Sequence, residues 1–161
     1  MPKEKKLKGV QDLACPATAV AIHPELQDFL GYAMSKLAMR VRSRMDELVS
    51  RYGIVAPQCG ILKMLHRVGP MTQVELGSYM MIDKATMVRF LDGLEELGLA
   101  VRSTHDSDRR AKVLKITAKG AKLLEKVREA RIEAEETVLA PLDKKEREEL
   151  RRLVRKMAQQ T

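Results

Sequence analysis

The feature that most constrains the fold is a change in the spacing of apolar residues directly after Gly98. Before that glycine, apolar residues recur every three or four positions, which is typical of amphipathic helices. After it, apolar and polar residues alternate over 99–103, and a second apolar group at 113–116 follows a polar stretch. Because alternation with period two is typical of strands, we predict a two-stranded hairpin with a long polar tip over residues 104–110.

Four helices are predicted before the hairpin. The first runs from Pro24 to about Arg51 and ends at Gly53, a usual helix-ending residue. Its length of about 27 residues leaves an apolar stripe that one small domain does not cover, so we expect a partner subunit to cover it. This stripe comprises Leu30, Met34, Leu37, Val41, Met45 and Leu48.

The next three helices are short. One fits Pro57 to about Arg67, with a proline in its first turn and inward-facing Ile61, Leu62 and Leu65. Another begins at a capping box formed by Thr72 and Glu75 and ends near residues 80–81. The last follows Asp83 as its N-cap and closes at Gly98.

Two further helices follow the hairpin. Thr117 opens the first, and a capping box of Asp143 and Glu146 opens the second after Pro141. The order of elements predicts a mainly α chain, a winged helix-turn-helix with long flanking dimerisation helices. We assign residues 1–23 to a flexible arm, 24–56 to an N-terminal dimerisation helix, 57–117 to the winged unit and 118–161 to C-terminal dimerisation helices.

Charge and composition narrow the function. The 161 residues carry a net charge of +8, which favours a polyanionic partner such as nucleic acid. Residues 69–118 have no net charge, so a DNA-binding surface in this segment requires its cationic and acidic side chains to lie on different faces. No apolar run is long enough for a membrane span or a signal-peptide core, and we expect a cytoplasmic protein with no membrane partner.

Four stretches resemble the MarR family of bacterial and archaeal transcription regulators. Asp108-Arg109-Arg110, followed after five further residues by Ile116-Thr117, is similar to the wing signature of that family. Residues 71–76 resemble the start of a helix in that family, 83–99 its recognition helix and the turn into the wing, and 117–120 the start of the helix after the wing. Their order and spacing make the resemblance specific over about residues 57–125.

The resemblance implies that the helix after Asp83 reads the major groove of duplex DNA. A helical wheel centred on Val88 turns Met87, Val88, Leu91 and Leu94 inward, and the outward arc then falls in the first two turns. On that arc we expect Arg89 to contact guanine, Lys84 to contact phosphate and Ala85 to contact a thymine methyl group. The complete predicted set on this helix is Lys84, Ala85, Thr86, Arg89 and, at the edge of the arc, Phe90.

Two further groups complete the predicted DNA contacts. The resemblance implies that Arg110 enters the minor groove while Asp108 helps to hold the hairpin tip, with Arg109 and His105 as weaker candidates beside them. Thr72 and Gln73 lie at a helix N-terminus, where free N–H groups attract phosphate, although a plain capping role is equally compatible.

No enzymatic site is predicted. The three histidines are far apart, the two cysteines lack metal-ligand spacing, and no glycine-rich phosphate loop is present, so we expect no metal and no cofactor. The ten methionines are expected to fill the core. An open alternative is a methionine-lined pocket for a small hydrophobic effector, which the resemblance to the MarR family would place between the dimerisation helices and the winged unit.

The sequence thus predicts a homodimeric DNA-binding regulator on a near-palindromic operator, a repressor released by a small apolar or phenolic effector. One alternative is a redox-sensing regulator that uses Cys15 or Cys59. Another is a winged-helix module that binds proteins and never DNA. Neither cysteine has a basic cluster nearby, which favours incidental roles for both.

Overall fold

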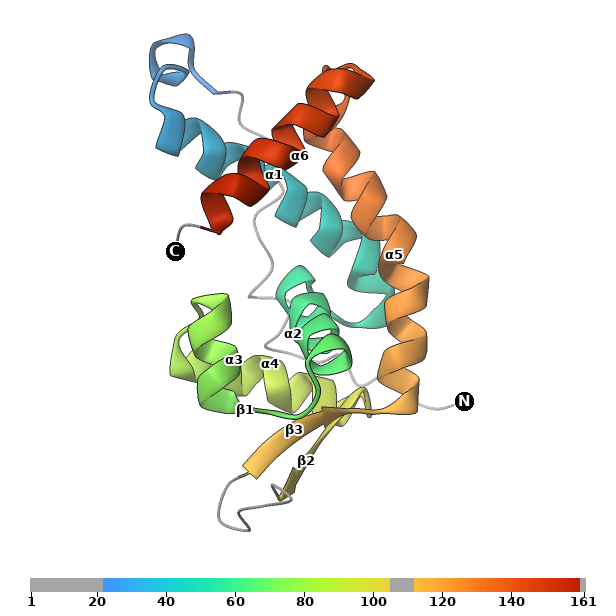
Figure 1. Cartoon of the computed structure of the whole chain (residues 1–161). Coiled ribbons are helices and arrows are strands. Elements are labelled where there is room, and N and C mark those ends of the chain that lie inside the picture. The colour runs from blue at the N-terminus through green and yellow to red at the C-terminus, as the bar shows by residue number, and fades with distance from the viewer. Residues whose placement is uncertain (1–21, 105–111, 160–161) are drawn as a thin grey trace.

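The computed structural model describes residues 22–104 and 112–159. Helices dominate, and a small sheet lies at one end of the molecule, at the bottom of Figure 1. The helical elements are η2 (Pro24–Leu26), α1 (Leu30–Val49), η3 (Ser50–Tyr52), α2 (Ala56–Arg67), α3 (Gln73–Met80), α4 (Lys84–Glu96), α5 (Ala118–Leu139) and α6 (Lys144–Ala158). The strands are β1 (Met71–Thr72), β2 (Ala100–Thr104) and β3 (Lys112–Ile116).

The single long helix predicted from Pro24 to Arg51 is wrong at its N-terminal end. Phe29 has a ψ of 86°, outside the helical range, so the 3₁₀ turn at Pro24 is separate from the 20 residues of α1. The other end is confirmed: the chain tightens into η3 and stops at Gly53, whose φ of 73° is left-handed. The other predicted helices begin and end within one or two residues of their expected positions.

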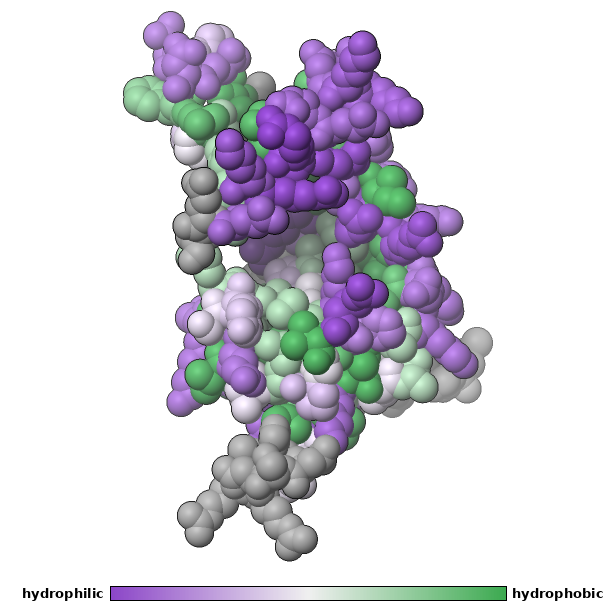
Figure 2. All heavy atoms as spheres, viewed as in Figure 1, coloured by the Kyte–Doolittle hydropathy of each residue, from purple (hydrophilic) through white to green (hydrophobic). Residues whose placement is uncertain are grey.

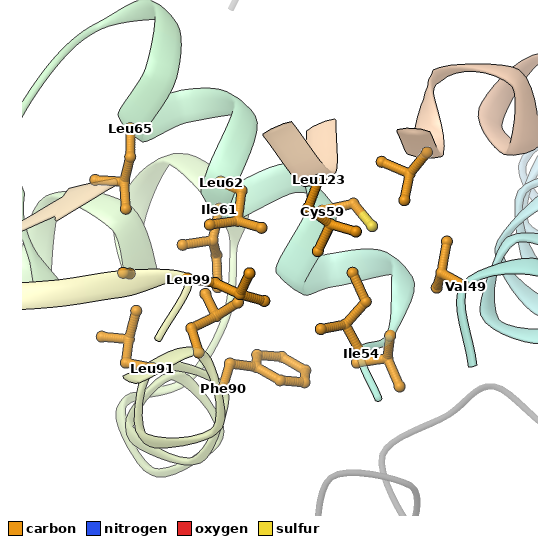
Figure 3. Packing of buried hydrophobic residues seen from close by; sticks show 14 of the residues in the cluster. Val49, Ile54, Cys59, Ile61, Leu62, Leu65, Phe90, Leu91, Leu99 and Leu123 are labelled. Carbon is orange, nitrogen blue, oxygen red and sulfur yellow. The ribbon is translucent and has the colours of Figure 1, made fainter. Parts of the chain in front are cut away.

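The core lies where α2, α4 and the sheet meet. Ile61, Leu62 and Leu65 of α2 are buried, as the sequence predicts, against apolar residues of α4. Figure 3 shows these side chains pointing into one cluster. Gln58, which is fully buried, ties the two helices together because its Nε2 donates to the carbonyl oxygen of Phe90 at 2.9 Å. Its Oε1 accepts from the N–H of Val55 at 3.0 Å, so both polar ends are satisfied.

The sheet has one strand more than predicted. β2 and β3 form the expected antiparallel hairpin, with Ala100 opposite Ile116 and Thr104 opposite Lys112. β1 adds to the free edge of β3, so the order is β1-β3-β2. Two residues are too short a run to show an alternating pattern, which is why the sequence does not reveal β1.

The upper part of the molecule is built from α1, α5 and α6 (Figure 1). Arg44 of α1 forms an ion pair with Glu133 of α5 at 2.5 Å, and buried residues of α5 face α1 and α2. The N-terminal half of α1 and the whole of α6 leave apolar side chains in solvent, Leu30 being 70% exposed. Figure 2 shows such residues gathered at the N-terminal end of α1. Within the described residues, no helix is both long and apolar enough to cross a bilayer.

Candidate nucleic-acid interface

The start of α3 is fixed by a capping box. The Thr72 hydroxyl accepts from the N–H of Glu75 at 3.2 Å, and the Glu75 carboxylate accepts from the Thr72 N–H at 2.7 Å. Thr72 also belongs to β1, where it pairs with Val113 of β3. The predicted cap is therefore confirmed, and the sheet fixes the end of α3 that carries Thr72 and Gln73. Both side chains are half-buried.

The start of α4 presents the predicted outward residues to solvent. Asp83 caps the helix by accepting from the N–H of Thr86 at 2.9 Å, and this hydrogen bond lowers the pKa of the carboxyl. Lys84, Ala85 and Arg89 are exposed and Thr86 is half-buried. One side of the first two turns therefore carries two cations among small side chains, a surface that fits a polyanion.

Phe90 does not belong to this surface, contrary to the prediction. Its side chain is 2% exposed, and its ring points into the core in Figure 3. It lies three residues after Met87 and four before Leu94, so it shares their helix face. Val88, which the helical wheel puts at the centre of the inward arc, is only half-buried. The predicted inward positions of Met87, Leu91 and Leu94 are confirmed.

Arg102 also belongs to this region, although no motif in the sequence singles it out. Its guanidinium on β2 pairs with Asp92 of α4 at 2.7 Å and also with Glu95. Its main-chain N–H donates to Glu95 at 2.8 Å. The sequence gives little sign of these ion pairs, because they depend on how β2 folds back along α4. Its effect is to offset two carboxylates that would otherwise repel a phosphate backbone.

The predicted wing residues His105, Asp108, Arg109 and Arg110 fall between β2 and β3 in the sequence and lie outside the described residues. Cys15 also lies outside them. The described strands that flank the wing segment are well anchored. Thr117, directly after β3, donates to the carbonyl oxygen of Gly98 at 2.8 Å and so joins β3 to the end of α4.

A cavity of about 480 Å³ lies between α1, α2 and α5. Its apolar lining includes Met45, Ala56, Cys59 and Val127. Its charged residues are mostly cationic, because Lys63, Arg67, Arg128 and Arg131 stand against the single acid Glu125. Met45 is its only methionine, so it is not the methionine-lined pocket that the sequence left open.

Cys59 is buried among apolar neighbours. Burial, with a smaller contribution from the charge of Asp46, raises the pKa of its thiol to about 12. The thiol is therefore protonated and unreactive at neutral pH, which argues against a redox switch at this residue. In the part of the chain that the structure describes, no three His, Cys, Asp or Glu side chains cluster as metal ligands would.

Comparisons with known proteins agree with this architecture. Residues 54–112 match a family model described as the MarR family. The chain is 28% identical over 129 residues to YwoH of Bacillus subtilis, an uncharacterised helix-turn-helix transcriptional regulator, covering 80% of this chain and 93% of YwoH. It is also 28% identical over 124 residues to the transcriptional regulator PecS of Dickeya dadantii, covering 75% of each.

Among solved structures, a MarR transcriptional regulator from Methanosarcina mazei superposes with a TM-score of 0.75 at 28% identity, covering 83% of this chain and 96% of that one. The fold shared with it is the winged helix-turn-helix framed by long helices that the sequence predicts. These matches span the winged unit and the helices on either side of it. Residues 54–112 thus match the MarR family, and the chain as a whole is similar to helix-turn-helix transcription regulators.

Proposed function

We propose that the protein is a homodimeric transcriptional regulator that reads duplex DNA with the first two turns of α4. The observation that carries this proposal is the exposed surface of Lys84, Ala85 and Arg89, which lies on a helix whose opposite side is locked into the core. A recognition helix needs both properties, because base edges are read by side chains held on a rigid element.

Each residue then has a distinct role. Arg89 donates two hydrogen bonds to a guanine, Lys84 contacts phosphate, and Ala85 packs on a thymine methyl group. Thr72 and Gln73 bring the N-terminus of α3 to a neighbouring phosphate, using N–H groups of the first turn. In the wing, Arg110 enters the minor groove with Asp108 holding the tip, and Arg109 and His105 lie beside them.

Two relatives of the same fold support DNA as the partner. A mutant MarR from E. coli has been solved in complex with operator DNA, and it superposes with a TM-score of 0.70 at 22% identity, covering 84% of this chain and 99% of that one. MepR of S. aureus has been solved as a DNA complex, with a TM-score of 0.66 at 23% identity, covering 81% and 97%. A regulator of this kind works in the cytoplasm, alongside the DNA that it reads.

Dimerisation uses the apolar surfaces that the single chain leaves in solvent. They comprise the N-terminal half of α1, with Leu30 and Met34 exposed, and one face of α6, with Leu150, Leu153 and Met157 exposed. Covering them with a second copy removes that area from water. Two copies related by a two-fold axis would place their α4 helices in successive major grooves, about 10 bp apart, on a near-palindromic operator.

A small apolar or phenolic acid is the effector that best fits the 480 Å³ cavity. The apolar floor suits a hydrophobic body, and the cationic rim suits a carboxylate. BpsR of Bordetella bronchiseptica, whose DNA binding is regulated by 6-hydroxynicotinic acid, shares the fold with a TM-score of 0.71 at 22% identity, covering 86% and 98%. The cavity lies between helices of the dimerisation region and the winged unit, so a bound ligand can favour one spacing of the two α4 helices in the dimer. A ligand that favours a spacing unable to fit the operator releases DNA, and the protein then acts as a repressor.

Selection of bound sequences from random duplexes tests the DNA-binding role. We expect the wild-type chain to enrich a two-fold symmetric sequence. Arg89→Ala should lose preference at one position of each half-site, at a cost of about 1–3 kcal/mol, and Arg110→Ala should weaken binding mainly at A·T-rich flanks. Equal enrichment by all three proteins would remove both assignments. Failure of the wild type to enrich any duplex would favour the protein-binding module instead.

Sedimentation of charge variants tests the dimer. Leu153→Glu with Met157→Glu places two carboxylates on the apolar face of α6 and should yield a folded monomer with weakened operator binding. Lys145→Glu changes charge on the same helix away from that face and should sediment as the wild type does. A wild-type chain that is monomeric at micromolar concentration would contradict the dimer.

A further inference from the structure

A second cavity, of about 420 Å³, lies at the foot of α5 and shares no lining residue with the cavity assigned to the effector. Its walls come from three separate segments: Tyr52 of η3, Leu97 and Leu99 at the turn between α4 and β2, and the first turns of α5. It therefore touches the end of the recognition helix directly, which the effector cavity does not.

The lining combines an apolar floor with a cationic rim. Leu99 is 3% exposed and closes the floor together with the half-buried Tyr52 and Leu97. Lys119, Lys122 and Lys126 recur at spacings of three and four on α5, so they share one helix face above that floor. No aspartate or glutamate belongs to the lining.

These lysines are not offset in the way that other cations of the molecule are. Arg44, Arg102, Arg131, Arg147 and Arg152 each pair with a carboxylate. Among the described residues, Lys122 and Lys126 form no such ion pair. Three ammonium groups over a hydrophobic floor favour a ligand that has an apolar body and a negative group.

Lys119 links the cavity to α4. Its Nζ donates to the carbonyl oxygen of Leu97 at 2.7 Å, at the C-terminal end of the helix, where the helix dipole favours a cation. At the same end of the helix, the N–H of Gly98 donates to the carbonyl oxygen of Glu95 and the N–H of Leu99 to that of Leu94, both at 2.8 Å. An anion in the cavity competes with that carbonyl for the Lys119 ammonium, and so loosens the last turn of α4.

We propose that this cavity binds an amphipathic organic anion, a carboxylate on a ring or short apolar chain, and couples its binding through Lys119 to the end of the recognition helix. Binding and loosening of α4 are independent of whether the protein binds DNA. Only the consequence for operator affinity rests on the proposed function.

The three tyrosines of the chain make the binding measurable, because Tyr52 alone lines this cavity. In the full chain labelled with 3-fluorotyrosine, three ¹⁹F resonances are expected, and Tyr52→Phe assigns one of them. Titration with 2-naphthoate should shift the Tyr52 resonance to saturation, whereas neutral 2-naphthamide should shift it at least tenfold less at equal concentration.

Two double variants, each of which removes two positive charges, distinguish naphthoate binding at this cavity from binding at the effector cavity. Lys122→Gln with Lys126→Gln should raise the half-saturating naphthoate concentration at Tyr52 by tenfold or more, and Lys63→Gln with Arg67→Gln, at the effector cavity, should leave it unchanged. An equal response to the amide, or wild-type binding by the Lys122/Lys126 variant, would overturn the site. A lowered DNA affinity and salt slope in that variant, with no naphthoate binding by the wild type, would assign these lysines to DNA phosphates instead.

Hydrogen exchange tests the coupling. Saturating naphthoate should speed exchange of the Gly98 and Leu99 amides threefold or more, and Lys119→Met should show fast exchange there without ligand. Naphthoate binding with unchanged exchange at these two amides would refute the coupling through Lys119.

Discussion

The main-chain N–H of Arg102 on β2 donates to Oε1 of Glu95 on α4 at 2.8 Å, and the Arg102 guanidinium binds Oε2 of the same carboxylate. The guanidinium also reaches Asp92, one helical turn earlier. The first strand of the wing is thus attached to the recognition helix through both backbone and side chain. This attachment fixes the angle between the two elements that we propose read DNA.

Replacing Arg102 by alanine should therefore weaken both the fold and DNA binding. Because hydrogen bonds to charged groups contribute about 1.5–3 kcal/mol and this pair is about a third exposed, we expect a loss of about 1–2 kcal/mol in urea unfolding. Operator affinity should fall further, since Asp92 and Glu95 then repel phosphates. Arg131→Ala, which removes an exposed pair on α5, should change stability by less than about 0.5 kcal/mol. Equal effects of the two variants would argue against the role of Arg102.

Phe90 and Val88 test which face of α4 is buried. Phe90→Ala should cost about 3–5 kcal/mol, because it empties a fully enclosed part of the core. Val88→Ala, at a half-buried position, should cost under about 1 kcal/mol. Thermal or urea denaturation of the two variants measures the difference. A small effect at Phe90 with weakened DNA binding would restore the outward position that the sequence suggested.

The sequence predicted the order of the helices and their caps, because these depend on local patterns. Thr72 with Glu75 and Asp143 with Glu146 form the expected capping boxes, since each motif needs only neighbouring residues. The helical wheel puts Phe90 at the edge of the outward arc because it gives the angles between residues of α4 but not the direction of the core. Met87 and Leu94, with Phe90 between them, set that direction only after α4 packs on α2.

Features that depend on distant segments were missed. β1 forms only because β3 offers a free edge to Met71 and Thr72. The pair between Arg102 and Glu95 requires β2 to fold back beside α4. Both cavities join residues from segments far apart in the sequence, so neither spacing nor composition reveals them.

Gly120 should not tolerate a side chain. A Cβ there would lie 2.2 Å from the carbonyl oxygen of Leu99 and 2.8 Å from Cγ1 of Ile116, where α5 passes close to the start of β2. Gly120→Ala should therefore lower the free energy of unfolding by more than about 2 kcal/mol. Gly31→Ala, in a helix with nothing within 4 Å, should leave it unchanged or slightly higher. Similar calorimetric midpoints for the two variants would contradict this close approach.

Cys59 should be inert in the folded chain. In a Cys15→Ser background, iodoacetamide should modify Cys59 at pH 8 only after urea unfolding, and peroxide should leave DNA binding intact. Rapid modification of the native chain would revive the redox alternative.

The raised pKa of Cys59 also has a stability consequence. The unfolded thiol releases its proton above its ordinary value of 9.0, while the folded thiol keeps it up to about pH 12. The unfolded state gains from that ionisation, so the free energy of unfolding falls as pH rises through this window. Cys59→Ala should show a shallower fall between pH 9 and pH 10.5, and identical slopes would contradict the burial of the thiol.

The salt dependence of affinity for the selected duplex tests most directly whether a dimer binds DNA through the cationic residues of α4 and the wing. Each phosphate neutralised adds about 0.9 to the slope of log affinity against log salt, so a dimer making about 6–10 phosphate contacts should lose about 10³–10⁵ in affinity between 50 and 200 mM salt. Lys84→Ala should make the dimer's slope shallower by about two, one contact from each copy. A wild-type affinity that does not change over this range would contradict the account.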